Sequence, residues 1–234
     1  TGGAVPVFML MNSFSTSADT TAHLAARFPE MGGRETWELM QNKVPKVLAG
    51  SLEPATWPAN PDHEWCPPGH GDIYACLAGS GWLERLLAGG VRYAFVSNSD
   101  NLGATLDPAI LAWFADSGMP FAMEVTRRTE SDKKGGHLAV RLRDGRFLLR
   151  ESAQCPKEDE WHFQNVDLHR YFNTNNLWID LQALKNALDA NDGLIPLAPI
   201  MNKKTVDPRD GSSPAVVQVE TAMGAAIECF QGAG

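Results

Sequence analysis

Short apolar segments of strand length alternate along this chain with segments of helical periodicity, and that alternation restricts the possible folds more than any single motif does. Residues 5–11 form a continuous apolar run, the pattern of a strand that is covered on both faces. Residues 108–116 start with a proline in the first turn, which favours a helix. Leucines three and four positions apart predict a helix over 177–188. The alternation indicates an α/β protein with a mixed, mostly parallel sheet flanked by helices.

The other predicted elements fit the same plan. A helix capped by Asp19 or Thr20 runs through Phe28, a helix over 73–87 has a break near 79–81, and a helix of small residues starts at about 221. Further strands are predicted at 44–48, 92–96, 121–125 and 215–219, and an antiparallel hairpin pairs 138–142 with 146–150 around Asp144 and Gly145. We therefore expect residues 1–234 to form a single domain.

The charge balance excludes one large class of partner. Lys and Arg number 20 and Asp and Glu 28, so the formal net charge is −8. Nucleic-acid binding depends on clustered basic side chains that release counterions from phosphates, which this composition does not supply. The longest apolar run is also much shorter than the roughly 20 residues of a membrane helix. We expect neither nucleic acid nor a membrane as a partner.

The four cysteines contain no CxxC pair and do not form the framework of a disulfide-rich protein. A reducing, cytoplasmic location is the simplest expectation. His63, Cys66, His70 and Cys76 lie close together in sequence and could in principle bind zinc. Their spacing matches no common zinc framework, so we favour ordinary loop residues and a small buried thiol.

Polar residues follow the predicted strands at the edge where ligands bind in open α/β sheets. Asp100 comes directly after the strand at 92–96, between two asparagines and two serines. Such an oxygen-rich setting suits Mg²⁺, which keeps several waters and takes one or two carboxylates. The alternative is an Asx-turn in which Asp100 caps the next helix.

Two glycine-containing loops can approach an anionic ligand closely. The loop 67–72, Pro-Pro-Gly-His-Gly-Asp, combines stiff backbone with two glycines around His70. The loop 133–136, Lys-Lys-Gly-Gly, combines two positive charges with two glycines, whose backbone N–H groups are accessible to an anion. Plain turns and a solvated hairpin entry are the respective alternatives.

Three asparagines lie within four residues in the segment 172–178, between Phe172 and Trp178. Amide groups beside apolar side chains are a common way to recognise sugar hydroxyls. Helix capping accounts for one of them, Asn175 or Asn176, but not for all three. Glu220, at the end of the strand at 215–219, either faces the same edge or favours the start of the following helix.

Six motifs together resemble the eukaryotic-type UDP-glucose pyrophosphorylases, the UTP:glucose-1-phosphate uridylyltransferases. They occur in the family's order and cover nearly the whole chain. The motifs are LMNSFSTSADT (10–20), WCPPGHGDIY (65–74), FVSNSDNLGAT (95–105), MEVTRRTESDKKGGHL (123–138), FNTNNLWIDL (172–181) and VETAMGAAI (219–227). The resemblance implies a Rossmann-like nucleotidyltransferase fold of the glycosyltransferase-A type. It also implies transfer of UMP from UTP to glucose 1-phosphate with Mg²⁺, which yields UDP-glucose and pyrophosphate.

The resemblance also implies roles for individual residues. Gln41, Gly69 and His70 resemble the residues that contact the nucleotide, and His70 and Asp100 those of the catalytic centre. Asp100 resembles the metal ligand. The positions similar to the family's sugar-contacting residues are Asn98, Gly136, Glu151 and Asn175. Since both substrates are anions, binding is expected to rely on metal and on local basic groups, for which Arg127, Arg128, Lys133 and Lys134 are the candidates.

Family members carry a glycine-rich loop and a lysine upstream of the first motif, and a further lysine and a β-helix downstream of the last. We expect this chain to be the central part of such a catalytic domain, with Lys203 and Lys204 not replacing the downstream lysine. The sequence leaves open a uridylyltransferase for another sugar 1-phosphate or an N-acetylhexosamine 1-phosphate, and a non-catalytic fragment that binds nucleotide sugars.

Overall fold

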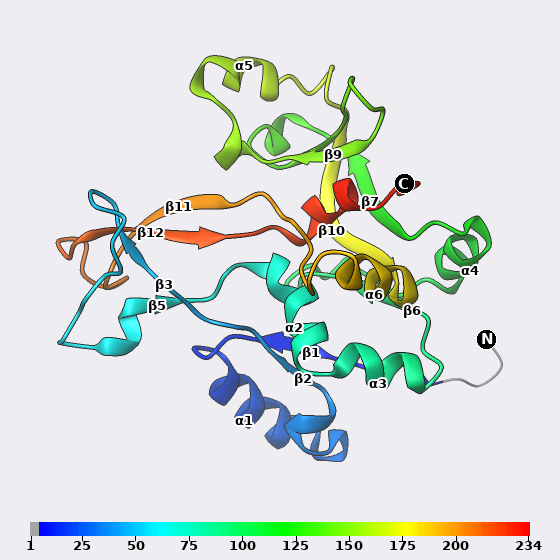
Figure 1. Ribbon diagram of the computed structural model, residues 1–234, viewed down its shortest axis with the longest axis horizontal. Helices are drawn as coiled ribbons and strands as arrows, with labels where there is room; N and C mark the ends of the chain where they lie inside the picture. The colour runs from blue at the N-terminus through cyan, green and yellow to red at the C-terminus, as the bar shows by residue number, and fades with distance from the viewer. Residues whose placement is uncertain (1–4) are drawn as a thin grey trace.

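The structure is a computed structural model that describes residues 5–234. At its centre lies a five-stranded sheet organised around the long strand β10 (Tyr171–Asp180) (Figure 1). β10 pairs antiparallel with β6 (Tyr93–Val96) along one edge and with β7 (Phe121–Arg127) along the other. β6 and β7 therefore run in the same direction, with β10 between them.

Helix α4 (Pro108–Ser117) connects β6 to β7. Its first turn is capped by Asp107, whose Oδ1 accepts a hydrogen bond from the Ala109 N–H at 2.7 Å. Phe114 on this helix is fully buried against Trp178 of β10, with ring centroids 6.4 Å apart. The cap and the aromatic contact fix the helix on the sheet.

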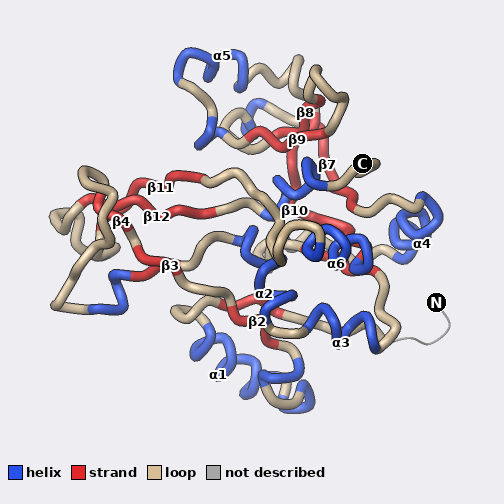
Figure 2. The backbone as a smooth tube through the Cα atoms, viewed as in Figure 1, coloured by secondary structure: helices blue, strands red, loops and turns tan. Residues whose placement is uncertain are grey.

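The main hydrophobic core joins the sheet to a group of helices. Buried residues of β10, among them Leu177 and Ile179, share one cluster with Leu184 of α6. Figure 2 shows the helices of this group lying beside β6 and β10. They are α2 (Ile73–Gly79), α3 (Trp82–Ala88) and α6 (Leu181–Asp189).

Two lobes extend from this core (Figure 1). The hairpin lobe comprises β8 (His137–Val140), β9 (Phe147–Arg150) and the short helix α5 (Glu160–Phe163), and joins the sheet where His137 pairs with Phe172 of β10. The arm comprises the antiparallel strands β4 (Val47–Leu48), β11 (Ile200–Thr205) and β12 (Ala215–Glu220).

Short elements complete the fold. β1 (Leu10–Asn12) pairs in parallel with β2 (Glu38–Met40) and is followed by α1 (Ser17–Arg27). β3 (Val44–Pro45) pairs antiparallel with β5 (Trp65–Cys66). The remaining turns are 3-10 helices: η1 (Pro29–Met31), η2 (Arg34–Thr36), η3 (Pro61–Glu64), η4 (His70–Asp72), η5 (Glu130–Asp132), η6 (Ser152–Gln154), η7 (Lys157–Asp159) and η8 (Met223–Cys229).

The mixed α/β class is confirmed, but the strand pairing is not mostly parallel. Among residues 5–234, β1 with β2 is the one parallel pair, and the other ladders are antiparallel. The reason is that β10 inserts between β6 and β7 instead of leaving them adjacent. No helix of the described residues has the length and apolar character needed to cross a membrane.

Several boundaries differ from the sequence predictions. The strand predicted at 5–11 is β1 alone, and Val5 and Phe8 are largely exposed. The strand at 44–48 is split at Lys46, whose N–H donates to the Glu64 carbonyl while its own carbonyl accepts from Ala55. The helix predicted over 177–188 begins only at Leu181, because Asp180 caps it through the N–H groups of Gln182 and Ala183.

The two remaining helix predictions also need correction. The N-cap of α1 is Thr16, not Asp19 or Thr20. The segment predicted as a helix from about 221 is the 3-10 helix η8. The break at 79–81, the helix at 108–116 and the hairpin around Asp144 and Gly145 are confirmed.

Candidate active site

The loop 67–72 is joined to the chain that leaves β12. The Gly71 N–H donates to the Thr221 carbonyl at 2.9 Å, and the Thr221 N–H donates to the Pro68 carbonyl at 2.8 Å. Gly69 has a φ of +83°, and a Cβ at this position would lie 2.6 Å from the Thr221 oxygen. Only glycine allows both the left-handed backbone and this approach.

His70 is fixed by the first residue of η8. Its Nδ1 accepts a hydrogen bond from the Met223 N–H at 3.0 Å. Because Nδ1 is an acceptor, the neutral ring carries its proton on Nε2. Burial lowers the pKa of His70, and the nearby Glu220 carboxylate opposes that shift. The site thus holds a neutral imidazole with one N–H donor.

Met223 is held at both of its backbone polar groups. Its carbonyl accepts a 2.7 Å hydrogen bond from the hydroxyl of Tyr74, which is buried on α2. Burial raises the pKa of Tyr74, so the hydroxyl remains a donor at neutral pH. Met223 is therefore a rigid support for His70.

Gln41 lies against the same loop. Its side-chain Nε2 donates to the Gly69 carbonyl at 2.6 Å, which leaves Oε1 as an acceptor. The adjacent Asn42 is fixed by Asp72, whose carboxylate accepts from its backbone N–H at 2.7 Å and from its side-chain Nδ2 at 3.0 Å. The structure thus brings together the three predicted nucleotide-contacting residues.

A second group gathers where the hairpin lobe meets β10. A Cβ on Gly136 would lie 2.7 Å from Glu151 Oε1, so the missing side chain of Gly136 makes room for this carboxylate. Burial raises the pKa of Glu151. The Gly136 carbonyl accepts the Asn173 N–H at 3.0 Å, which ties the pair to β10.

Asn175 lies in a β-bulge of β10. The register with β7 shifts between Asn173 and Asn176, and Asn175 takes a φ of +58°, a conformation that asparagine tolerates better than most residues. Reciprocal 2.9 Å hydrogen bonds with the Asn173 side chain hold it there. Three of the four predicted sugar-contacting residues, Gly136, Glu151 and Asn175, are thus in one place.

The start of η8 connects the two groups. Met223 supports His70, and a Cβ on the next residue, Gly224, would lie 3.3 Å from Asn173 Nδ2. Met223 and Gly224 are site residues that the sequence did not point to individually, and Asn173 was included only as one of the three clustered asparagines. The motif VETAMGAAI and the cluster of asparagines were the available signals.

The loop that carries Asn98 and Asp100 is anchored to β10 as well. The Asn101 N–H closes a turn onto the Asn98 carbonyl at 3.1 Å, and Asn101 Nδ2 donates to Asn176 Oδ1 at 3.2 Å. Asp100 itself is exposed. It does not cap the next helix, since Asp107 does so. Within residues 5–234 no hydrogen bond or ion pair engages its carboxylate, so both oxygens can take a ligand.

The basic candidates do not all face solvent. Arg128 is buried, and its guanidinium donates to the carbonyls of Phe163 at 2.7 Å and of Lys133 at 2.6 Å. The prediction that Arg128 binds an anion is therefore wrong, because its donors hold the loop 128–136. Lys133 pairs with Glu130, whereas Arg127 and Lys134 are exposed.

The four possible zinc ligands have separate partners. His63 faces Asp207 at 3.5 Å, Cys66 is buried in β5, His70 accepts from Met223, and Cys76 donates to Asp72. Over the described range 5–234, no three His, Cys, Asp or Glu side chains come close enough together to hold a metal ion.

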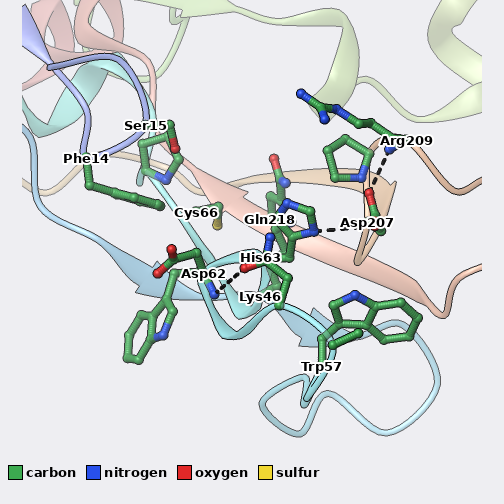
Figure 3. A pocket seen from close by; sticks show the side chains of 15 residues that line it. Phe14, Ser15, Lys46, Trp57, Asp62, His63, Cys66, Asp207, Arg209 and Gln218 are labelled. Atoms are coloured by element: carbon green, nitrogen blue, oxygen red, sulfur yellow. Dashed lines mark hydrogen bonds and ion pairs between the residues drawn. The ribbon is translucent and has the colours of Figure 1, made fainter. Parts of the chain in front are cut away.

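An open cavity of about 680 Å³ lies between the arm and β5 (Figure 3). Lys46 and Gln218 are among its lining residues, and the Lys46 Nζ donates to the Val206 carbonyl at 2.7 Å. None of the predicted site residues lines it. It adjoins the candidate site through Pro67, two residues before Gly69.

Comparison with known proteins establishes the family of the chain. The sequence model of the family described as UTP--glucose-1-phosphate uridylyltransferase matches residues 1–234. The chain belongs to the UTP–glucose-1-phosphate uridylyltransferase family. Among curated relatives, the Saccharomyces cerevisiae enzyme is 43% identical over 226 residues, which are 96% of this chain and 44% of the relative. The barley enzyme is 38% identical over 231 residues, which are 98% of this chain and 46% of the relative.

Solved structures of the same family share the fold. A UDP-glucose pyrophosphorylase structure from Trypanosoma brucei matches with a TM-score of 0.91 and 53% identity, covering 97% of this chain and 48% of that one. A variant of the Leishmania major enzyme, solved in complex with UDP-glucose, matches with a TM-score of 0.88 and 53% identity, covering 97% and 50%. The nucleotidyltransferase fold of this family is thereby confirmed. The chain spans about half the length of the family members it matches.

Proposed function

We propose that this protein transfers UMP from UTP to glucose 1-phosphate, forming UDP-glucose and pyrophosphate. One observation carries the proposal most strongly. The Met223 N–H donates to His70, and a Cβ on the adjacent Gly224 would lie 3.3 Å from Asn173 Nδ2, so nucleotide-binding and sugar-binding candidates lie on either side of a single turn. A nucleotide sugar is the class of molecule that needs both groups at once.

The group of nucleotide-binding candidates, Gln41, Gly69 and His70, can recognise uracil by its hydrogen-bonding pattern. One hydrogen of Nε2 is donated to the Gly69 carbonyl, so Gln41 still offers the acceptor Oε1 and a second N–H. An acceptor pairs with the N3–H of uracil and not with the N3 lone pair of cytosine. The bare backbone of Gly69 allows the base and ribose to approach closely.

The sugar half offers acceptors for hydroxyl groups. Glu151 lies against Gly136, and its half-buried carboxylate accepts hydrogen bonds from sugar hydroxyls. Asn175 adds amide groups in a fixed orientation. A sugar of the wrong configuration leaves such groups unpaired at a cost of about 1–3 kcal/mol each.

Catalysis then rests on position and charge. An oxygen of glucose 1-phosphate attacks the α-phosphorus of UTP in line, the bond to the β-phosphate oxygen breaks, and pyrophosphate leaves. Such transfers need oriented reactants and neutralised phosphate oxygens rather than a covalent enzyme intermediate. The Nε2–H of His70 donates to a phosphate oxygen, and no general base is required.

Mg²⁺ fits the donors at the end of β6. Asp100 is an exposed carboxylate with both oxygens available. Hard oxygen ligands of this kind, completed by phosphates and water, are the usual Mg²⁺ environment. When bound, Mg²⁺ neutralises charge on the phosphates. A cytoplasmic location, without nucleic-acid or membrane partners, completes the proposal.

A substrate panel tests the function. Purified protein is incubated with UTP, Mg²⁺ and either glucose, galactose or N-acetylglucosamine 1-phosphate, and UDP-sugar and pyrophosphate are quantified. We expect equimolar UDP-glucose and pyrophosphate, with glucose 1-phosphate the preferred acceptor. Preference for another sugar 1-phosphate assigns a different substrate. Binding of UDP-glucose without turnover assigns a non-catalytic role.

A further inference from the structure

A directional chain of hydrogen bonds connects β7 to the loop that carries Asp100. Glu124 of β7 accepts from Trp178 Nε1 at 2.7 Å through Oε1 and from Asn176 Nδ2 at 2.9 Å through Oε2. Asn176 Oδ1 accepts from Asn101 Nδ2 at 3.2 Å. Asn101 Oδ1 in turn accepts the Gly103 N–H at 3.2 Å. We call these four bonds the Glu124 relay.

The chemistry of its two ends fixes the direction of the relay. An indole N–H and a backbone N–H can only donate, and these are Trp178 and Gly103. The Glu124 carboxylate has no hydrogen to offer, so Asn176 must turn its Nδ2 toward it and its Oδ1 toward Asn101. Asn101 must then present Nδ2 to Asn176 and keep Oδ1 for Gly103. One carboxylate thus sets the orientation of two amides.

Glu124 also supports the bulge that holds Asn175. The Thr174 hydroxyl donates to the Glu124 backbone carbonyl at 2.7 Å and accepts the Asn176 N–H at 3.3 Å. The backbone of Glu124 therefore contacts the bulge. Its side chain is linked through Asn176 to the loop that carries Asp100.

We propose that Glu124 is a positioning residue, which acts through Asn176 and Asn101 to fix the loop 98–103 relative to the glucose-binding residues. The geometric part stands on the hydrogen bonds alone, and the catalytic consequence rests on the proposed function. Glu124 itself is not required to touch either substrate. Its predicted effect is on the placement of Asn98 and Asp100.

An exchange of chemical groups tests this directly. In Glu124→Gln, the new amide accepts from Trp178 through Oε1 and turns its Nε2 toward Asn176. There the Nε2 donor faces the Nδ2 donor of Asn176, and no hydrogen bond can form. In Asn176→Asp two carboxylates face each other. In the double variant Glu124→Gln with Asn176→Asp, the new amide at position 124 donates to one carboxylate oxygen at position 176, and Asn101 donates to the other. The complete relay is restored with the same number of heavy atoms.

Two readouts separate the relay from the proposed function. The first is hydrogen exchange of the Gly103 amide, followed by NMR without substrates. The second is the kcat for UDP-glucose formation, together with the KM of UTP. We expect each single variant to speed Gly103 exchange and lower kcat about tenfold, the equivalent of one lost hydrogen bond. The double variant should return to within about threefold of the parent, and KM for UTP should change little.

Controls guard against general damage to the fold. Asn101→Ala interrupts the relay at its exposed end without changing the Glu124 carboxylate, and should reproduce the single variants if one of these fails to fold. Gln182→Glu is the matched control, because it makes the same kind of amide–acid exchange in an exposed hydrogen-bonded pair. On α6, Gln182 Nε2 donates to Asn186 Oδ1 at 3.0 Å. This control variant should leave both readouts unchanged.

Each outcome decides one part of the proposal. Unchanged Gly103 exchange in Glu124→Gln, or a double variant no better than the singles, overturns the relay. Faster exchange with an unchanged kcat overturns the positioning role. If the parent protein does not transfer a uridylyl group, the proposed function is refuted. The hydrogen exchange of the Gly103 amide still tests the relay, because it is measured without substrates.

Discussion

His70 Nδ1 accepts the backbone N–H of Met223 at 3.0 Å, and the two residues lie 153 positions apart in the chain. This bond joins the loop 67–72, which follows β5, to η8, which follows β12. It holds the imidazole in the tautomer with a proton on Nε2. The proposed role of His70 as a hydrogen-bond donor to phosphate depends on it.

The pH dependence of kcat should follow from that bond. Because burial lowers the pKa of His70, the neutral form persists below the usual range of histidine titration. We expect kcat to hold as pH falls through that range and to drop only at lower pH, where protonation of Nδ1 removes the acceptor for Met223. His70→Leu should lower kcat about 100-fold and abolish that acid limb. An acid limb that persists in His70→Leu would show that another group titrates.

Gly69→Ala should destabilise the protein. Its φ of +83° and the Thr221 oxygen 2.6 Å from a Cβ predict a loss of about 1–3 kcal/mol in the free energy of unfolding, measured by urea denaturation. Gly79→Ala is the matched control, since its φ is not positive and a Cβ there meets nothing within 4 Å. It should be neutral or slightly stabilising, and equal effects of the two variants would contradict the prediction.

Gly136→Ala should weaken sugar binding specifically. The new methyl group would lie 2.7 Å from Glu151 Oε1 and would push the carboxylate away from its position. We expect the KM of glucose 1-phosphate to rise about tenfold or more, with less than about a threefold change in the KM of UTP. Gly211→Ala, in open space, is the control. A parallel rise in both KM values would argue against a separate sugar subsite.

His137 should make the hairpin lobe sensitive to acid. It is fully buried, neither ring nitrogen has a hydrogen-bond partner among the described residues, and its ring stacks on His169 at 4.1 Å. Burial, His169 and the charges of Arg128 and Arg150 lower its pKa to about 3. The unfolded chain therefore binds the extra proton between about pH 6.5 and pH 3, and stability must fall as pH falls through that window.

Replacing His137 tests that sign. His137→Leu removes the group that titrates and should flatten the decline of the unfolding free energy between pH 7 and pH 4, without loss of stability at pH 8. The measurement is urea denaturation across this pH series. An unchanged slope would assign the acid sensitivity to other groups.

Local signals were enough to predict part of this fold. Asp107 and Pro108 mark the start of α4, the glycines at 79 and 81 separate α2 from α3, and Asp144 with Gly145 turns the β8–β9 hairpin. Each of these depends on residues within a few positions of one another. The error at Leu177 has the opposite cause. This residue of β10 is fully buried, and a strand buried on both faces offers no alternation that distinguishes it from a helix.

The site was predictable only as a set of separate motifs. Gln41, Gly69 and His70 are brought together as the resemblance implied, and Asn175 lies near Gly136 and Glu151. Nothing in the sequence showed that Met223 and Gly224 would form the contact between the two groups, because these bonds span distant segments. Arg128 was misassigned for the same reason, since its carbonyl partner Phe163 lies 35 residues away.

The most direct test of the proposed function is the forward reaction of the purified protein with UTP, glucose 1-phosphate and Mg²⁺, compared between the parent and Gly136→Ala. The parent should form UDP-glucose and pyrophosphate in equal amounts, and saturating glucose 1-phosphate should restore much of the rate of the variant. Absence of UDP-glucose from the parent reaction, with both substrates and Mg²⁺ saturating, would contradict the proposal.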